Sequence, residues 1–407
     1  MRITAIRATP VNIPLEVPFF WSVGVYPGTT KVVIEVQTDE GLVGLGEAPS
    51  PSCAPLVTDF MAARLAGADA FDIQACERLC VPDARVDANT ADRTAMRAFG
   101  GIEMALWDLR GKAWGQPLYK LLGGAVRKEI PFTEYFAYRQ EGDNVGGEST
   151  PAQVAAYCAE MRDVHGSTTF EGKCPPGDAK ATIEVVREVR RAVGDDAMIR
   201  LDANMGFSVN AARRILAGIE PYDVDNFEDP VATFYEMATL RQHSRIPFSS
   251  HVPDLRLAAR LGVPDSIVLN LTQLGGISRT LKFVAACEEM GVDVWCYSGD
   301  SGIASAAYLH VVAATQHMYR PSQSLFRWQT DDVTEEGPLR PRHNVLPVPE
   351  GPGLGVTLSS SALERCHERF KEEGPYDEFY NPSHPGEYAR LPLCQSRELR
   401  SARRRPA

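Results

Sequence analysis

Charged and polar side chains recur at one kind of place in this sequence, the ends of short apolar segments. Glu171 and Lys173 stand two residues apart in the segment TTFEGKC. Successive side chains of a strand point to opposite faces, so this spacing puts an acid and a base on the same side. Such a pair is either an ordinary solvated ion pair or part of a reaction centre that moves protons.

Three later segments end in groups that can bind a cation. MIRLDAN, VDNFEDP and IPFSSH carry Asp202, Glu228 and His251, which are spaced 26 and 23 residues apart, about one strand and one helix each. Adjacent parallel strands bring such residues close together, and two unpaired carboxylates repel unless a cation lies between them. We therefore expect Asp202, Glu228 and His251 to hold a divalent metal; helix caps and salt bridges at the strand ends are the alternative.

Further polar residues follow the same strand ends. We expect four of them to contact a substrate, namely Asn204, Asn270, Tyr297 and Ser301. Asp229, which directly follows Glu228, is expected to support a metal ligand rather than to bind the metal itself.

These groups need elements that bring them to one place. From about residue 128, eight apolar segments alternate with stretches such as AKATIEVVREVRRAV, in which apolar residues recur every three and four positions. That pattern is typical of helices packed on a parallel sheet, and eight such units favour a closed barrel over a doubly wound open sheet. The predicted strands are residues 129–136, 168–174, 198–204, 224–230, 246–251, 266–271, 293–298 and 324–329.

The two ends of the chain have a different pattern. Residues 1 to about 50 alternate as strands, and KVVIEVQT and LVGLGE, joined at DEG, predict a hairpin followed by helices over 54–65, 72–79 and 91–122. After Thr330 the periodicity lapses until the helix SSALERCHERFKEE and a basic end. We therefore divide the chain into an α+β domain (1–125), a barrel (126–335) and a C-terminal segment with a basic tail (336–407).

Composition narrows the possible partners. The net charge of −11 opposes binding to nucleic acid, which requires lysine and arginine to neutralise phosphates. No apolar run approaches the roughly 18 residues of a membrane span. The start, MRITAIRATPVNI, alternates polar and apolar residues and lacks the pattern of a secretory signal, so we expect a cytoplasmic protein that acts on a small molecule.

Several motifs are similar to those of the enolase superfamily, specifically its mandelate racemase and muconate lactonizing enzyme group. They are TDEGLVGLGEA (38–48), FGGIEMALWDLRGKAWGQPLYKLLGG (99–124), and LDAN followed by FEDP. FEGK, FEDP, FRWQ, and PGLGV followed by CHERF look most like the glucarate dehydratase branch. The resemblance implies a (β/α)7β barrel, a capping domain built from both ends of the chain, a homo-oligomer, and a Mg²⁺ site used to abstract the proton α to a carboxylate through an enediolate.

By position, the resemblance makes Asp202 and Glu228 metal ligands and Lys173 a base or acid. The branch has two lysines, K-x-K, where this chain has Glu171 and Lys173. A neighbouring ammonium would lower the pKa of Lys173, whereas a carboxylate favours its charged form. We therefore expect Lys173 to act as a general acid or an electrostatic clamp, with Glu171 as a candidate base.

Three other positions bear on the reaction. His251 replaces a carboxylate or Asn, and imidazole is a softer ligand, so we expect Mn²⁺, Fe²⁺ or Zn²⁺ to be accepted as well as Mg²⁺. Asn270 and Ser301 stand where the branch has an Asp–His dyad, and neither is a base, although Asp300 or Tyr297 are possible substitutes. Trp21, in PFFWSVGVYPG, belongs either to a loop that closes over the substrate or to the core of the small domain.

Loss of the dyad argues against racemisation, which needs proton transfer on both faces of the substrate. The sequence therefore predicts a metal-dependent lyase that dehydrates a polyhydroxy (sugar) acid to a 2-keto-3-deoxy acid. An epimerase, racemase or cycloisomerase of a carboxylate substrate is the alternative among enzymes. A catalytically silent protein that binds an acid sugar is the alternative of another class.

Overall fold

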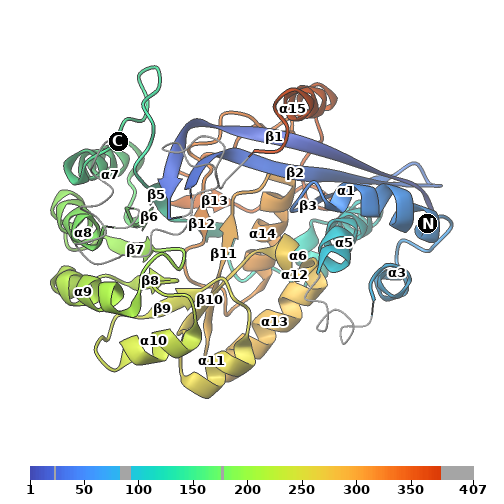
Figure 1. Cartoon of the computed structure of the whole chain (residues 1–407). Helices are drawn as coiled ribbons and strands as arrows, with labels where there is room; N and C mark the ends of the chain where they lie inside the picture. Colours follow the sequence, from blue (N-terminus) through green and yellow to red (C-terminus); the bar gives the residue numbers. More distant parts are fainter. Residues whose placement is uncertain (23, 83–92, 176–177, 377–407) are drawn as a thin grey trace, which may run out of the picture.

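The centre of the computed structural model, which describes residues 1–22, 24–82, 93–175 and 178–376, is a parallel sheet of eight strands. The strands neighbour one another in chain order, and backbone hydrogen bonds from Thr133 N to Ser322 O (2.8 Å) and from Ser322 N to Pro131 O (2.9 Å) join the first to the last. The sheet therefore closes into a barrel (Figure 1), as predicted. Its strands are β5 (Glu134–Phe136), β6 (Thr169–Lys173), β7 (Met198–Asp202), β8 (Asn226–Glu228), β9 (Phe248–Ser250), β10 (Ser266–Leu269), β11 (Asp293–Ser298) and β12 (Gln323–Ser324).

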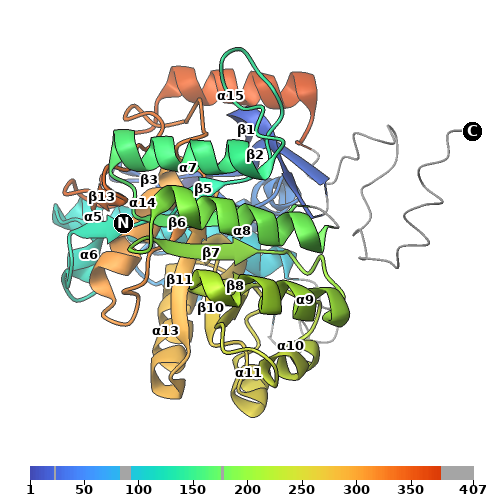
Figure 2. The same ribbon diagram turned by 90° about the vertical axis from the view of Figure 1, so that its left-hand side faces the viewer.

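Helices follow the strands and cover the outside of the barrel, as Figure 2 shows for α7 to α11. Several begin at a residue whose side chain accepts a hydrogen bond from the first turn, among them Thr150, Asp178 and Ser208, so the sequence itself sets these starts. The barrel helices are α7 (Pro151–His165), α8 (Ala179–Val193), α9 (Val209–Ile219), η2 (Glu220–Tyr222), α10 (Phe234–Arg241), α11 (Leu255–Leu261), α12 (Leu271–Leu274), α13 (Ile277–Met290) and α14 (Gly302–Ala314).

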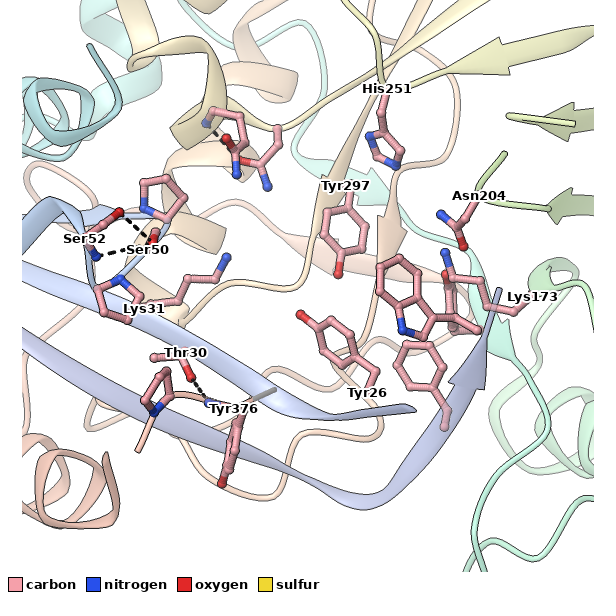
Figure 3. A pocket seen from close by; sticks show the side chains of 18 residues that line it. Tyr26, Thr30, Lys31, Ser50, Ser52, Lys173, Asn204, His251, Tyr297 and Tyr376 are labelled. Carbon is pink, nitrogen blue, oxygen red and sulfur yellow. Dashed lines mark hydrogen bonds between the residues drawn. The ribbon is translucent and has the colours of Figure 1, made fainter. Parts of the chain in front are cut away.

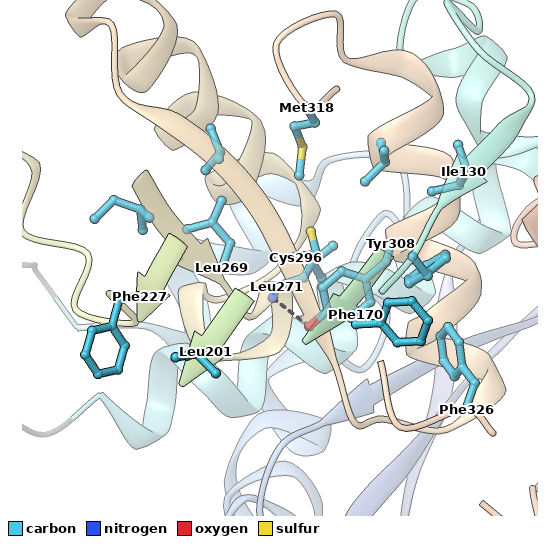
Figure 4. Packing of buried hydrophobic residues seen from close by; sticks show 14 of the residues in the cluster. Ile130, Phe170, Leu201, Phe227, Leu269, Leu271, Cys296, Tyr308, Met318 and Phe326 are labelled. Carbon is cyan, nitrogen blue, oxygen red and sulfur yellow. Dashed lines mark hydrogen bonds between the residues drawn. The ribbon is translucent and has the colours of Figure 1, made fainter. Parts of the chain in front are cut away.

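Helix α14 is buried on all sides from Gly302 to Ala313, which its small and apolar residues permit. Tyr308 accepts a hydrogen bond from Leu271 N (2.9 Å) within the barrel core (Figure 4). On the opposite side, Nδ1 of His310 accepts from Tyr119 N (3.2 Å), in α6 (Leu118–Leu121). The helix thus joins the barrel to the domain that covers it.

That second domain is an antiparallel sheet of β1 (Ile3–Trp21), β2 (Gly24–Thr38) and β3 (Val43–Ala48), and it contains the predicted hairpin. Helix α5 (Thr94–Trp114) lies directly on β3, because Gly46 and Gly101 allow the two backbones to touch; a Cβ on Gly46 would overlap the carbonyl oxygen of Gly101. The remaining elements are α1 (Cys53–Pro55), a π-helix η1 (Leu56–Met61), α2 (Ala62–Leu65) and α3 (Ile73–Cys80).

The C-terminal segment returns to this sheet. Strand β13 (Val345–Pro347) pairs with β4 (Glu129–Pro131), and α15 (Ser360–Glu373) lies along β1, where His367 Nδ1 donates to Pro10 O (2.7 Å). Both ends of the chain therefore build the capping domain. The domain boundaries at residues 125 and 335 stay predictions, and the basic tail lies outside the described residues.

Three elements have different bounds in the structure from those predicted. The helix expected over 91–122 ends at Gly115, whose φ of 61° is left-handed, and α6 begins after Pro117. The first strand is divided into β4 and β5 after Pro131. The eighth strand ends at Ser324, because Leu325 O accepts from Trp328 N (3.0 Å) and closes a turn. No helix among the described residues combines the length and the apolar content needed to span a bilayer.

One buried carboxylate fastens the capping domain to the barrel. Glu103, in α5, accepts hydrogen bonds from Ile277 N (2.7 Å) and Ser278 N (3.0 Å), two N–H groups in the first turn of α13. The hydroxyl of Ser278 (2.5 Å) and the indole N–H of Trp107 (2.8 Å) donate to it as well. Glu103 therefore caps a barrel helix from another domain, which aligns α5 with the end of β10.

We predict that Glu103→Ala lowers the free energy of unfolding by about 3 kcal/mol, because it leaves several buried donors without an acceptor. Urea denaturation measures this change. Glu160→Ala, on the exposed face of α7, is the matched control and should change the value by less than about 0.5 kcal/mol. Equal effects of the two substitutions would contradict the proposed link.

Candidate active site

The strand register places the expected site residues side by side. Lys173 is paired with Asp202, and Asp202 with Glu228, at the C-terminal ends of β6, β7 and β8. His251 directly follows β9. All four residues thus lie at the end of the barrel where the loops after the strands meet, which is where barrel enzymes carry their active sites.

Asp202, Glu228 and His251 form a compact group of ligand atoms. One such atom from each residue lies within 4.8 Å of the others, and both carboxylates are fully buried. Burial and the charges of Asp202 and Asp229 raise the pKa of Glu228 well above its usual value. Nε2 of His251 lies 2.8 Å from Oε1 of Glu228, yet this oxygen accepts no hydrogen bond within the described part of the chain. Carboxylate oxygens and an imidazole nitrogen are common ligands of divalent cations. Their close spacing here, with one oxygen left without a hydrogen bond, fits such a cation.

Lys173 points from β6 towards the same group. Its ammonium is paired with Oδ2 of Asp202, and it lies 5.8 Å from the ring centroids of both Trp21 and Tyr135. Burial disfavours the charged form, but the charges of Asp202 and Glu228 outweigh it, so the pKa of Lys173 is raised. The structure therefore holds Lys173 as an ammonium while the carboxylates carry their charge.

A cavity of about 600 Å³ opens above these residues (Figure 3). The barrel contributes to its lining five of the expected residues: Lys173, Asn204, His251, Asn270 and Tyr297. The capping domain contributes Trp21, so the structure places this tryptophan on the cavity wall. The other cap residues at the wall include Tyr26, Lys31, Ser50, Ser52 and, from the C-terminal segment, Tyr376.

Glu171 is not among the residues that line the cavity, and its role as a base stays a prediction. It pairs in register with Arg200, one step deeper in the barrel than Lys173, and its side chain is fully buried. Oε2 lies 3.7 Å from Nη1 of Arg200, but burial dominates and raises the pKa of Glu171 to about 8. Enclosed beneath the cavity, this carboxyl is placed to position its neighbours.

Gln323 is the neighbour that sequence reasoning missed. Its Nε2 donates to Oε1 of Glu171 (2.5 Å) and also to Oε2 of Glu228, so one amide group connects two buried carboxylates across the barrel. The predicted eighth strand began one residue later, at Ser324. Gln323 follows Pro321 by two residues and lies in a strand of only two residues. Nothing in the sequence indicated that its side chain faces the interior of the barrel.

Asn204 and Asp229 hold the surroundings of the metal-binding group. Asn204 has a left-handed backbone (φ 44°), and its N and Nδ2 donate to the two oxygens of Asp202, at 2.7 and 3.0 Å. Oδ2 of Asp229 accepts from His251 N (3.4 Å). Asp229 therefore contacts the backbone of the residue that follows β9, and its supporting role stays a prediction.

The two residues in place of the dyad have different surroundings. Asn270 caps α12, with Oδ1 accepting from Gln273 N (3.1 Å), and still lines the cavity. Ser301 is fully buried and caps α14, and its hydroxyl donates to Glu47 of β3. Glu47 and the helix thus enclose Ser301, and its contact with a substrate stays a prediction.

Lys31 reaches the cavity from β2 and was also missed. Its Nζ lies 2.6 Å from Oδ1 of Asp300, which is fully buried, and Glu47 lies close by. The charges of Asp300 and Glu47 outweigh the effect of burial and raise the pKa of Lys31. The only signal in the sequence was a lysine directly before the apolar run at residues 32–34, and its position in the cavity depends on how the cap docks on the barrel.

The sequence is similar to those of known proteins along most of its length. A sequence model of the mandelate racemase / muconate lactonizing enzyme N-terminal domain matches residues 3–123, and one described as enolase C-terminal domain-like matches residues 153–362. "Probable glucarate dehydratase" of Streptomyces coelicolor is 27% identical (92% of this chain, 93% of the relative). "Cis-3-hydroxy-L-proline dehydratase" of Roseibium aggregatum is 31% identical (88% and 96%), and "Chloromuconate cycloisomerase" of Delftia acidovorans is 28% identical (88% and 97%).

Solved structures of similar proteins share the fold. An enolase from Streptomyces coelicolor is 31% identical, with a TM-score of 0.82 over 92% of this chain and 99% of that one. An enolase from Mycobacterium smegmatis complexed with tartrate is 27% identical, with a TM-score of 0.84 (93% and 94%). An enolase from Thermobispora bispora complexed with magnesium and formate is 26% identical, with a TM-score of 0.82 (92% and 94%).

The buried Glu47 should make stability depend on pH. Burial and the charge of Asp300 raise its pKa from 4.5 to about 8. Between these values the folded chain retains a proton that the unfolded chain has lost, so the free energy of unfolding falls as the pH rises through this interval. We predict that Glu47→Gln removes this part of the slope.

Urea denaturation of both proteins across that pH range measures the difference. Glu160→Gln, at an exposed carboxylate, should leave the slope unchanged. A Glu47→Gln slope as steep as that of the unsubstituted protein would contradict the assignment.

Proposed function

Because the chain belongs to the mandelate racemase and muconate lactonizing enzyme group of the enolase superfamily, we propose that it abstracts the proton α to the carboxylate of a small acid. The observation that carries this proposal is that Asp202, Glu228 and His251 lie beside Lys173, and that His251 and Lys173 line one cavity. The relatives are named as dehydratases and a cycloisomerase. Their names support the proposal of a first step common to both kinds of enzyme, the abstraction of the α-proton. The chain is accordingly an enzyme.

The proposed metal site is Asp202, Glu228 and His251, with Mg²⁺ the natural occupant because a similar enolase was crystallised with magnesium. When bound there, a divalent cation supplies positive charge for the carboxylate oxygens of the substrate, on which negative charge develops as the α-proton leaves. Gln323, which also donates to Glu171, holds Glu228 in place through a hydrogen bond. Asn204 does the same for Asp202 through two hydrogen bonds.

Lys173 is the group that we propose moves the proton. Its raised pKa depends on the charges of Asp202 and Glu228, because burial alone lowers it. Once these carboxylates are engaged as ligands, their hold on the ammonium weakens, and burial shifts Lys173 towards the neutral amine that accepts a proton. Its Nζ is already directed towards the cavity (Figure 3).

Dehydration of a polyhydroxy acid to a 2-keto-3-deoxy acid is the reaction that we favour. Asn270 and the enclosed Ser301 offer no base on the face opposite Lys173, and a one-face reaction needs none. After the α-proton has left, Lys173 as an ammonium can return a proton to the departing β-hydroxyl, which is a syn elimination of water. Two of the named relatives are dehydratases.

An isomerase remains the second candidate, because Tyr297 lines the same cavity and interacts electrostatically with both Lys173 and Lys31. In such an enzyme Tyr297 would serve the second face of the substrate. Deuterium uptake distinguishes the two reactions, since an isomerase exchanges the α-hydrogen of both epimers with solvent.

We predict that a screen of sugar acids with Mg²⁺, which detects 2-keto products, identifies a substrate, and that Lys173→Ala lowers turnover by about 10²- to 10⁴-fold through loss of the proton-transfer group. Lys180→Ala, at an exposed lysine of α8, is the matched control and should retain turnover. Binding of sugar acids without product or deuterium exchange would overturn the proposal in favour of a silent binding protein.

Metal identity should depend on His251. We predict that protein purified without added metal contains Mn²⁺, Fe²⁺ or Zn²⁺ beside Mg²⁺, and that His251→Asp shifts the preference towards Mg²⁺, because a carboxylate is a harder ligand than imidazole. Elemental analysis and calorimetric titration with Mg²⁺ and Mn²⁺ measure both effects. An unsubstituted protein that holds Mg²⁺ alone would contradict this role of the histidine.

A further inference from the structure

A second cavity of about 360 Å³ adjoins the first and has not been assigned a role. Four residues line both cavities: His251, Asn270, Gln273 and Tyr297. The far wall of the second cavity is the start of α5, which supplies Arg93 and Arg97. The two cavities are therefore neighbours that share part of their lining.

The second cavity is positively charged. Its lining contains two guanidinium groups and, among the described residues, no carboxylate. Arg97 is half-buried, and its buried Nε has no hydrogen-bond partner within the described part of the chain. A donor of this kind is costly to leave unpaired, so the lining is suited to an acceptor that comes from outside the chain.

His251 lies between the proposed metal site and the positively charged second cavity. Its Nε2 approaches Glu228 on one side, while the residue also lines the second cavity on the other. The ring of Tyr297 lies 5.8 Å from that of His251, nearly perpendicular to it (Figure 3). A ligand whose first carboxylate lies at the metal site can therefore extend past these two rings towards the arginines.

We propose that Arg93 and Arg97 form a subsite for a second anionic group of the substrate. Arginine matches an oxyanion through a fork of parallel N–H donors, and Gln273 adds a polar amide next to it. The preferred substrate is then a sugar acid with an oxyanion at each end, either a dicarboxylate or a phosphorylated acid. This inference rests on the proposed function for the position of the first carboxylate.

Three compounds of equal carbon number test the subsite. D-Gluconate, D-glucarate and 6-phosphogluconate differ at C6, which carries an alcohol, a carboxylate or a phosphate. Calorimetry with the Mg²⁺-loaded full-length protein gives the affinity for each compound. The readout is the affinity for each anionic probe divided by the affinity for gluconate. We expect a ratio above one for the unsubstituted protein, and a fall of about tenfold or more in Arg93→Gln/Arg97→Gln.

Arg260→Gln, at an exposed arginine of α11 outside both cavities, is the matched control and should preserve the ratio. A larger fall for glucarate identifies the second anion as a carboxylate, and a larger fall for 6-phosphogluconate identifies a phosphate. The inference is overturned if the unsubstituted protein prefers neither anionic probe, or if the double variant keeps the ratio within twofold.

A separate variant tests the proposed function on which the subsite rests. Asp202→Asn should weaken binding of all three compounds together, because each has its first carboxylate at the metal site. If Asp202→Asn binds them unchanged while the arginine variants lose the preference, the proposed metal site fails and the arginine subsite stands.

Discussion

The structure depends on the enclosure of several carboxylates inside one barrel. Glu171, Asp202 and Glu228 have no measurable exposure, and an unpaired charge in such a place is strongly unfavourable. The chain meets this constraint with Lys173 at the mouth, Gln323 across the interior and Arg200 underneath. One oxygen of Glu228 still has no hydrogen-bond partner among the described residues, and a divalent cation would bind it.

The same constraint extends to the capping domain. Lys31 from β2 faces the buried Asp300, and Glu47 from β3 accepts from Ser301, so the cap and the barrel share one network of charged groups. Neither domain has these partners without the other. Because the cap also supplies Trp21 and Tyr26 to the cavity, its docking sets both the charge balance and the shape of the space available to substrate.

Much of this arrangement could be predicted from the order of residues along the chain. Asp202, Glu228 and His251 recur about once per strand and helix, and that spacing brings them together in any barrel of this kind. How deep each side chain lies in the barrel was harder to predict. Strand alternation shows that Glu171 and Lys173 share a face, but only the register shows that Glu171 lies a step deeper. Lys31 and Gln323 depend on contacts between segments far apart in sequence, and a strand of two residues has no readable period.

The contact between α15 and β1 has a consequence for how the chain is made. Strand β1 is covered by α15, the last described helix (Figure 1), and the carbonyl oxygen of Asn12 accepts a hydrogen bond from Arg369, 357 positions later in the chain. Domains generally fold as units, with the N-terminal one first. Here β1 lacks its final covering until the helix that ends at Glu373 has been translated, so the barrel is synthesised in full before the cap is complete.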